Sequence, residues 1–210
     1  MATPDKPKRR PRRADGELSR NRILDAATEI AAERGYEGTS IGAVSAKCGL
    51  PASSIYWHFK DKDDLIAAVI ERSFEHWLKV WQLPEDVVAR ERLMEVAVGT
   101  AKAVMDSPDF LRLGLMLALE RRPVEPRARA RFIQVREQAH EALSSSLREL
   151  ALGLSEAQVD QLATYAIAGA DGLFIAKEIG GDTVDLVSLF TLHGNALYET
   201  AMRMIEENER

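Results

Sequence analysis

The densest group of hydrogen-bonding side chains in this 210-residue chain lies in residues 39–59, TSIGAVSAKCGLPASSIYWHF. Its second half interleaves small hydroxyl-bearing residues with aromatic ones. Serine hydroxyls can donate and accept hydrogen bonds at base edges, and an alanine methyl can contact the methyl group of thymine. The residues expected to contact bases are Ala52, Ser53 and Ser54.

Two short helices joined by a tight turn would present these side chains. Apolar residues at helical spacing predict a first helix within residues 41–48, and Thr39 is expected to cap its start. Gly49 suits the left-handed residue that ends a helix, and Pro51 suits the first turn of the next one. Ile55 and Phe59, four residues apart, should then point inward. This pattern predicts a helix-turn-helix whose second helix is sized for the DNA major groove.

These motifs resemble the amino-terminal domain of TetR-family transcriptional regulators. The matching segments are RGYEGTS at 34–40, GL at 49–50, IYWHF at 55–59 and KDKDDL at 60–65. The motif resemblance covers roughly residues 18–70. It implies an all-α, nine-helix TetR-like architecture, with an N-terminal three-helix helix-turn-helix domain and a C-terminal helical ligand-binding and dimerisation domain.

The chain also departs from the family pattern. The family often has Ser where this chain has Pro51 and Gly where it has Ser53, and Gly42 replaces a longer polar residue that could reach DNA. Base reading should therefore depend more on the start of the second motif helix. The identity of the operator cannot be carried over from the family.

Further DNA contacts are expected at the backbone. A helix start with hydroxyl groups and free N–H groups suits phosphate, and the resemblance implies that residues after the base-contacting serines grip phosphates and set the register. For Trp57, half-buried packing beneath the short helix is an equal alternative. The expected phosphate-side residues are Thr39, Ser40, Tyr56, Trp57, His58, Lys60 and Lys62.

Charge divides the chain into two unlike parts. Residues 1–60 carry a net charge of +4 and residues 61–210 carry −9, so one end of the molecule should face a polyanion. We expect a disordered basic tail at 1–14, a DNA-binding domain at 15–62 and an effector-binding and dimerisation domain at 63–210. The tail either stays solvated or lies along DNA phosphates or in a minor groove.

Composition excludes several classes of protein. Hydrophobic residues make up 46% and charged residues 29% of the chain, as in ordinary globular proteins. The longest apolar run, residues 113–119, is too short for a bilayer, and a single cysteine, Cys48, fits a reducing compartment. We therefore expect a cytoplasmic protein. Motifs for phosphate-binding loops or metal clusters are absent, so we expect no enzyme, cofactor or metal site.

Beyond the motif, Gly and Pro residues punctuate a series of helices. They predict helices at about 18–34, 61–83, 85–105, 109–121, 126–152, 155–180 and 182–207. Strand signals are absent.

Apolar stripes on the last two helices suggest a dimer interface. They pack either on their own core or, as the resemblance favours, on the same helices of a second subunit in a four-helix bundle. The expected interface residues are Leu162, Ala166, Ala170, Leu173, Phe174, Leu186, Phe190, His193, Leu197 and Ala201.

An effector pocket is implied by the resemblance, and an apolar lining would suit a hydrophobic or amphipathic ligand. Each of these residues could instead be ordinary core. The expected effector-binding residues are Trp77, Trp81, Phe110, Leu113, Met116, Leu117, Glu120, Phe132, Arg136 and Tyr165.

Together these features predict a homodimeric, ligand-responsive regulator that binds a pseudo-palindromic DNA operator, with the resemblance implying a repressor that a small molecule releases. An all-helical small-molecule binding protein without sequence-specific DNA binding is the main alternative. An all-α enzyme that uses the acidic C-terminal domain is a third.

Overall fold

The computed structural model describes residues 11–78, 89–120, 124, 126–150 and 153–210. Throughout these residues the regular elements are helices, as the sequence predicts. Their order is α1 (Pro11–Gly38), α2 (Ile41–Cys48), α3 (Ala52–His58), α4 (Lys62–Leu78), α5 (Ala89–Asp106), α6 (Asp109–Leu119), α7 (Arg127–Leu150), α8 (Glu156–Gly180), the 3-10 turn η2 (Gly181–Thr183) and α9 (Leu186–Asn208).

Helix α1 differs from the prediction at both ends. It begins at Pro11, inside the 1–14 segment expected to be a disordered tail; residues 1–10 lie outside the described residues. At the other end, Gly35 ends the regular helix as expected, because its φ of 67° breaks the helical geometry, but a further short helical stretch continues to Gly38. Glycine adopts this left-handed conformation without steric cost.

The remaining helix boundaries follow local signals. Ser155 caps α8 with a reciprocal hydrogen-bond pair to Gln158, and the side chain of Asp185 accepts from the N–H of Ser188 at the start of α9. Such caps satisfy backbone N–H groups that lack helical partners. The expected stops at Gly153 and before Pro108 also agree with the described helices.

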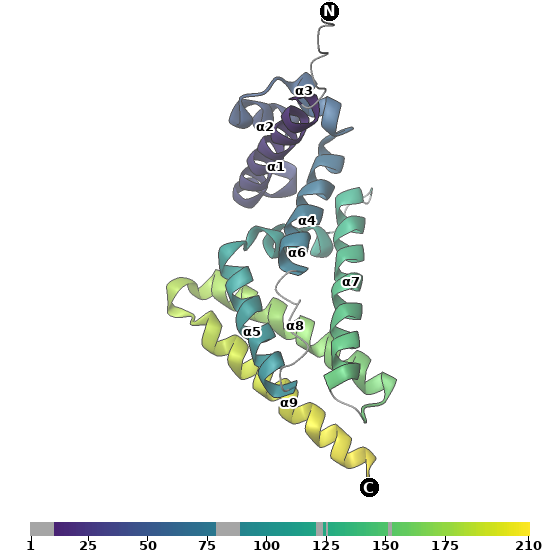
Figure 1. The fold of residues 1–210 in the computed structure, drawn as a ribbon. Helices are drawn as coiled ribbons and strands as arrows, with labels where there is room; N and C mark the ends of the chain where they lie inside the picture. The colour runs from purple at the N-terminus through teal and green to yellow at the C-terminus, as the bar shows by residue number, and fades with distance from the viewer. Residues whose placement is uncertain (1–10, 79–88, 121–123, 125, 151–152) are drawn as a thin grey trace, which may run out of the picture.

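Helices α1, α2 and α3 form a head at one end of the molecule, and α5, α8 and α9 lie at the other (Figure 1). Helix α4 runs from the head into the body and packs on α7, and α6 lies between the two parts against α1, α4 and α7. Helix α4 therefore joins the head to the body as a rigid connection, and α6 packs beside it.

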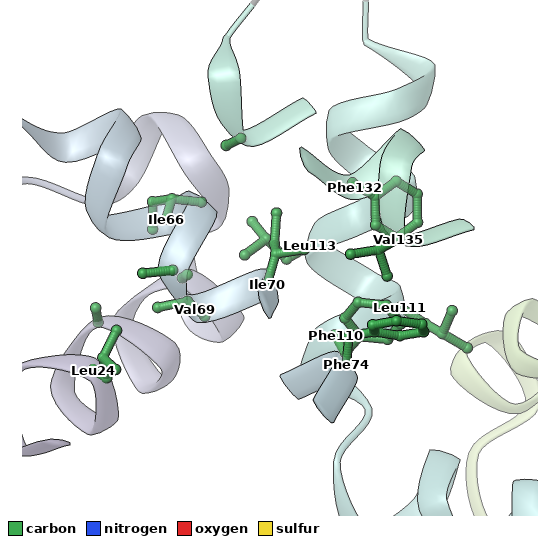
Figure 2. Close-up of a cluster of buried hydrophobic side chains, with 14 of the residues drawn as sticks. Leu24, Ile66, Val69, Ile70, Phe74, Phe110, Leu111, Leu113, Phe132 and Val135 are labelled. Atoms are coloured by element: carbon green, nitrogen blue, oxygen red, sulfur yellow. The ribbon is translucent and has the colours of Figure 1, made fainter. Parts of the chain in front are cut away.

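One hydrophobic cluster runs through both parts. Leu24 of α1 and Ile66 of α4 belong to the same buried cluster as Phe110 of α6 and Phe132 of α7. Figure 2 shows Phe74, Phe110 and Leu111 gathered near Phe132 and Val135. Because apolar burial favours the packed state, movement of the head relative to the body would have to rearrange side chains in this cluster.

Candidate nucleic-acid interface and ligand cavities

The turn between α2 and α3 is held by hydrogen bonds from three directions. Gly49 has φ 67° and ψ 22°, and its N–H donates to the carbonyl of Ser45. The hydroxyl of Ser45 donates to the carbonyl of Leu50 at 2.6 Å, and Nη2 of Arg22 in α1 donates to the carbonyl of Cys48 at 2.7 Å. These contacts fix the direction in which α3 leaves the turn.

The cap of α2 corrects one sequence prediction. Ser40, not Thr39, is the N-cap, and its Oγ accepts from the N–H of Ala43. Thr39 is 1% exposed, and its hydroxyl donates to the carbonyl of Gly35 at 2.8 Å. In this conformation the Thr39 hydroxyl faces the protein and does not reach a phosphate, whereas Ser40 is exposed.

Helix α3 buries one face and exposes the other. Ile55 is fully buried and Phe59 nearly so, which confirms the inward pair. Ser53 is exposed, and Ala52 and Ser54 are half-buried. A seven-residue helix with small residues at its start can approach a groove closely because little side-chain volume keeps it away.

Two aromatic residues of α3 project into solvent. Tyr56 is 57% exposed and Trp57 is 76% exposed, so the half-buried alternative for Trp57 is wrong. The Trp57 and His58 rings form a T-shaped contact, with their centroids 4.5 Å apart. Burial, and after it the nearby Arg20, lowers the pKa of His58, which favours the neutral ring in the DNA-free chain.

The two candidate lysines are in different situations. Lys60 is exposed. The ammonium of Lys62 donates to the carbonyl of Tyr36 at 3.2 Å, lies 4.3 Å from the centre of the Tyr36 ring and is 3.7 Å from Glu37. Lys62 therefore fastens the start of α4 to the end of α1.

Two neighbouring cavities lie among the described helices of the body. The larger, about 80 Å³, lies among α5, α7, α8 and α9 and is almost entirely apolar. The inner cavity, about 40 Å³, is lined by α4–α8, and both cavities touch Thr100, Ile167 and Ala170. The residues that line the inner cavity are Phe74, Trp77, Thr100, Phe110, Leu111, Arg136, Ala139, Ile167, Ala170 and Asp171.

A third hollow opens on the surface next to the inner cavity. This outer groove of about 480 Å³ lies among α6, α7 and α8 and shares Arg136, Ile167 and Asp171 with the inner cavity. Nη2 of Arg136 donates to Oδ2 of Asp171 at 2.5 Å. Burial raises the pKa of the Asp171 carboxyl, although the arginine opposes the shift.

The comparisons with known proteins agree with this architecture. The family model described as bacterial regulatory proteins, tetR family, matches residues 23–69. The transcriptional repressor AcnR of Corynebacterium diphtheriae is 29% identical over 178 residues, which cover 83% of this chain and 89% of the relative. The transcriptional regulator AcrR of Shigella flexneri is 37% identical over 59 residues, 28% of this chain and 27% of the relative. The amino-terminal part of the chain, residues 23–69, therefore belongs to the TetR family.

Solved structures of other regulators share the fold. The fatty acid degradation regulator FadR of Bacillus halodurans superposes with a TM-score of 0.71 at 18% identity, over 85% of this chain and 94% of that one. FadR of Bacillus subtilis, solved in complex with stearoyl-CoA, gives 0.66 at 21% identity, over 84% and 96%. The matches to the first curated relatives span only 27% to 43% of the length of those proteins.

The effector residues expected for a TetR-family member are scattered. Trp77, Phe110 and Arg136 line the inner cavity, and Phe132 lines the outer groove. The others lie elsewhere: Leu113 and Leu117 are buried outside the lining of either hollow, Met116 lies against Gly35, Glu120 and Tyr165 are exposed, and Trp81 lies outside the described residues.

The residues expected at the dimer interface pack largely inside the subunit. Leu162, Phe174, Leu186, Phe190, Leu197 and Ala201 are buried in its core clusters, and Ala170 and Leu173 pack against them. Ala166 and His193 line the larger cavity, with Nε2 of His193 3.0 Å from the carbonyl of Ala166. In the described subunit, the alternative that these stripes pack on their own core is therefore the one observed.

A different face of the same helices is open. Its large apolar residues are Tyr165, Ile175 and Ile179 on α8 and Leu192 on α9, and Ile179 is 83% exposed. Spacings of three to four residues place the exposed positions of α8 on one face. Sequence reasoning missed this face because α8 carries apolar residues on two sides. It also missed Asp171, which is 35 positions from Arg136.

Proposed function

We propose that this TetR-family chain is a homodimeric transcriptional repressor that binds a pseudo-palindromic DNA operator through α3 and is released by a small hydrophobic or amphipathic effector. The observation that carries the proposal is the α3 surface, where Ser53, Tyr56 and Trp57 stand exposed on a helix whose inner face is buried. In a monomeric head with no ligand, exposed aromatic side chains at this density have no packing role.

Each exposed residue has a role that follows from its chemistry. Ser53, with Ala52 and Ser54 beside it, reads base edges. Ser40, Tyr56 and Lys60 contact the phosphate backbone and set the register. Serine contacts are individually weak, so a second copy of the head would supply the remaining specificity by doubling the site.

The dimer would form through the open face of α8 and α9. Tyr165, Ile175, Ile179 and Leu192 provide exposed apolar area there, and Gly172 lies on the same face with nothing near the position of a Cβ atom. A small residue at such a position lets two helices approach closely. Because a two-fold interface uses the same patch on both subunits, this face has to be self-complementary.

Ligand control would act through α4 and α6. Both helices line the inner cavity and both contact α1 of the head. A ligand that favours one arrangement of these helices would change the separation of the two heads, and a coupling of about 1–3 kcal/mol is typical of such systems. The protein would act where its operator is found, in the cytoplasm, and no helix in the described part is long and apolar enough to span a membrane.

The deciding experiment is selection of duplex DNA from a random pool by the full chain, repeated at several salt concentrations. A repressor of this kind selects an inverted repeat, and its affinity falls steeply with salt. Ser53→Ala should relax the preference at particular base pairs, by about 1–3 kcal/mol if the contact is direct. Ser146→Ala, on α7, is the matched control.

Failure to select any sequence at any salt concentration would overturn the proposal and favour the alternative, a helical ligand-binding protein without sequence-specific DNA binding. Equal loss of affinity on every sequence for Ser53→Ala would contradict the assignment of base reading to α3.

A further inference from the structure

The Arg136–Asp171 pair forms the wall between the outer groove and the inner cavity. Both residues line both hollows, and each side chain keeps a quarter or less of its exposure. The groove is more open to solvent than the cavity behind the pair, which is lined mainly by aromatic and aliphatic side chains. A molecule that enters the cavity from the groove therefore passes this pair.

Two polar atoms at the inner cavity have no hydrogen-bond partner among the described residues. They are Nε1 of Trp77, which is a donor, and Oδ1 of Asp171, which is an acceptor. Trp77 is 7% exposed. Leaving a buried polar group unpaired is unfavourable, so a ligand group that pairs with both atoms should bind more tightly than one that pairs with neither.

The charge already present at the wall disfavours an ionic ligand. A cation beside Asp171 would lie close to the Arg136 guanidinium. An anion on Arg136 would either lie close to the Asp171 carboxylate or displace it and leave it buried without its partner. Breaking a buried ion pair in this way is strongly destabilising. A hydroxyl group avoids both costs, because one oxygen can accept from an indole N–H while its hydrogen is donated to a carboxylate.

The other residues that line the inner cavity determine the chemistry of the rest of the ligand. Phe74 and Phe110 stack at 6.1 Å between ring centres, and Trp77 lies 5.5 Å from Phe110; Figure 2 shows Phe74 and Phe110 together at this place. Ring–ring contacts of this kind favour an aromatic or aliphatic body. At about 40 and 80 Å³, each cavity is smaller than the roughly 150 Å³ that holds benzene in a protein core, so a compact body would have to span both cavities, and a long acyl chain has no room.

We propose that the inner cavity binds a compact, uncharged, largely apolar ligand that carries a hydroxyl group, with the oxygen between Trp77 and Asp171 and the body toward the larger cavity. This inference rests on the proposed ligand control of the TetR-family repressor and names the chemical class of its effector.

The test uses four probes with the same ring: benzyl alcohol, benzoate, benzylamine and toluene. Their binding to the full chain without DNA is measured by calorimetry or by ligand-observed NMR. Benzyl alcohol should bind tightest. Trp77→Phe keeps an aromatic ring and removes the N–H. It should weaken the binding of benzyl alcohol about fivefold, the effect of losing one hydrogen bond, and leave the affinity for toluene unchanged.

The matched control is Trp57→Phe, which removes the same group at an exposed position on α3 and should leave all four affinities unchanged. The probe ranking is measured on the unchanged chain, so it stands even if Trp77→Phe does not fold. Tightest binding of benzoate or benzylamine, equal binding of toluene and benzyl alcohol, or no binding of any probe would each overturn the inference.

The two proposals fail in distinguishable ways. If the chain selects an operator but benzyl alcohol does not rank first, the ligand class is wrong and the DNA function stands. If benzyl alcohol ranks first but no DNA sequence is selected, the cavity assignment stands and the proposed function fails.

Discussion

Asp63 on α4 binds the start of α7 through Arg127. One carboxylate oxygen of Asp63 accepts from the backbone N–H of Arg127 at 2.6 Å, and the other accepts from the N–H of Ala128 at 3.0 Å. The Tyr36 hydroxyl at the end of α1 donates to the same carboxylate at 3.2 Å. Asp63 therefore joins the head, the connecting helix and the body at one point.

Replacing this carboxylate should destabilise the protein. Asp63→Ala removes the acceptor for two N–H groups at the start of α7, and loss of a helix cap costs about 0.5–2 kcal/mol. We expect the free energy of unfolding to fall by about 1–2 kcal/mol, measured by urea denaturation at one fixed protein concentration because dimers unfold in a concentration-dependent way.

The control for Asp63→Ala is Glu209→Gln, which removes a carboxylate charge from an exposed position after α9. It should leave the free energy of unfolding within about 0.5 kcal/mol. If the two variants were equally stable, the link between α4 and α7 would contribute nothing.

Local sequence signals predicted most of the fold. Gly49 and Gly153 have positive φ, and Ser155 caps α8, because turn and cap preferences depend on neighbouring residues alone. The predicted start of the last helix at residue 182 was wrong, because the 3-10 turn Gly181–Thr183 follows α8 and Asp185 caps α9. The inward direction of Ile55 was also readable, since helical spacing fixes which residues share a face.

The parts that sequence could not predict depend on distant residues. Two faces of α8 carry apolar side chains, one with Leu162 and Phe174, the other with Ile175 and Ile179, and no local pattern tells which faces the core. The direction of Lys62 is set by Tyr36, 26 positions away. Likewise, the Arg136–Asp171 pair exists because α7 and α8 pack side by side.

Alanine substitutions of Lys60, which precedes α4, and of Lys62, which lies within it, should have different effects. Lys60→Ala should lower affinity for all DNA sequences alike and reduce the salt slope by about 1, with little change in stability. Lys62→Ala removes the contacts with the Tyr36 ring and carbonyl and should cost about 0.5–1.5 kcal/mol of stability. The measurements are a salt series of gel shifts and urea unfolding. A stability loss confined to Lys60→Ala would reverse the assignment.

A charge on the open face of α8 should prevent dimer formation. Ile179→Asp places a carboxylate in the apolar area proposed to meet a second subunit, and burying an unpaired charge is strongly unfavourable. We expect a monomer by analytical ultracentrifugation, with loss of operator binding. Val124→Asp is the control, because Val124 is 80% exposed and lies outside α8 and α9. A dimer formed by Ile179→Asp would show that another surface is used.

The cap of α9 should make stability depend on pH in the acid range. Hydrogen bonds from the Ser188 hydroxyl, and then from its N–H, lower the pKa of Asp185 below its usual value of 3.8. The stabilising contribution of such a group is present above the unfolded-state pKa and is lost as pH falls through the folded-state pKa.

Asp185→Asn keeps a capping oxygen that does not titrate. Its stability should match that of the unchanged chain at pH 7 and fall less steeply below about pH 4, measured by thermal unfolding between pH 2.5 and 7. Parallel pH curves for the two proteins would show that this carboxylate adds nothing to acid unfolding.

The close approach of α6 and α7 depends on Gly114. A Cβ atom at this position would lie 2.0 Å from the Phe132 ring, so one of the two helices would have to move. Overpacking of this kind costs about 1–3 kcal/mol. We expect Gly114→Ala to lower the free energy of unfolding by this amount, measured by urea denaturation. Gly42→Ala is the control, because its Cβ would meet nothing closer than 4.0 Å. Since α6 also contacts α1 of the head, Gly114→Ala should weaken operator binding by more than its lost stability explains. Unchanged stability would mean that Phe132 can turn aside without moving either helix.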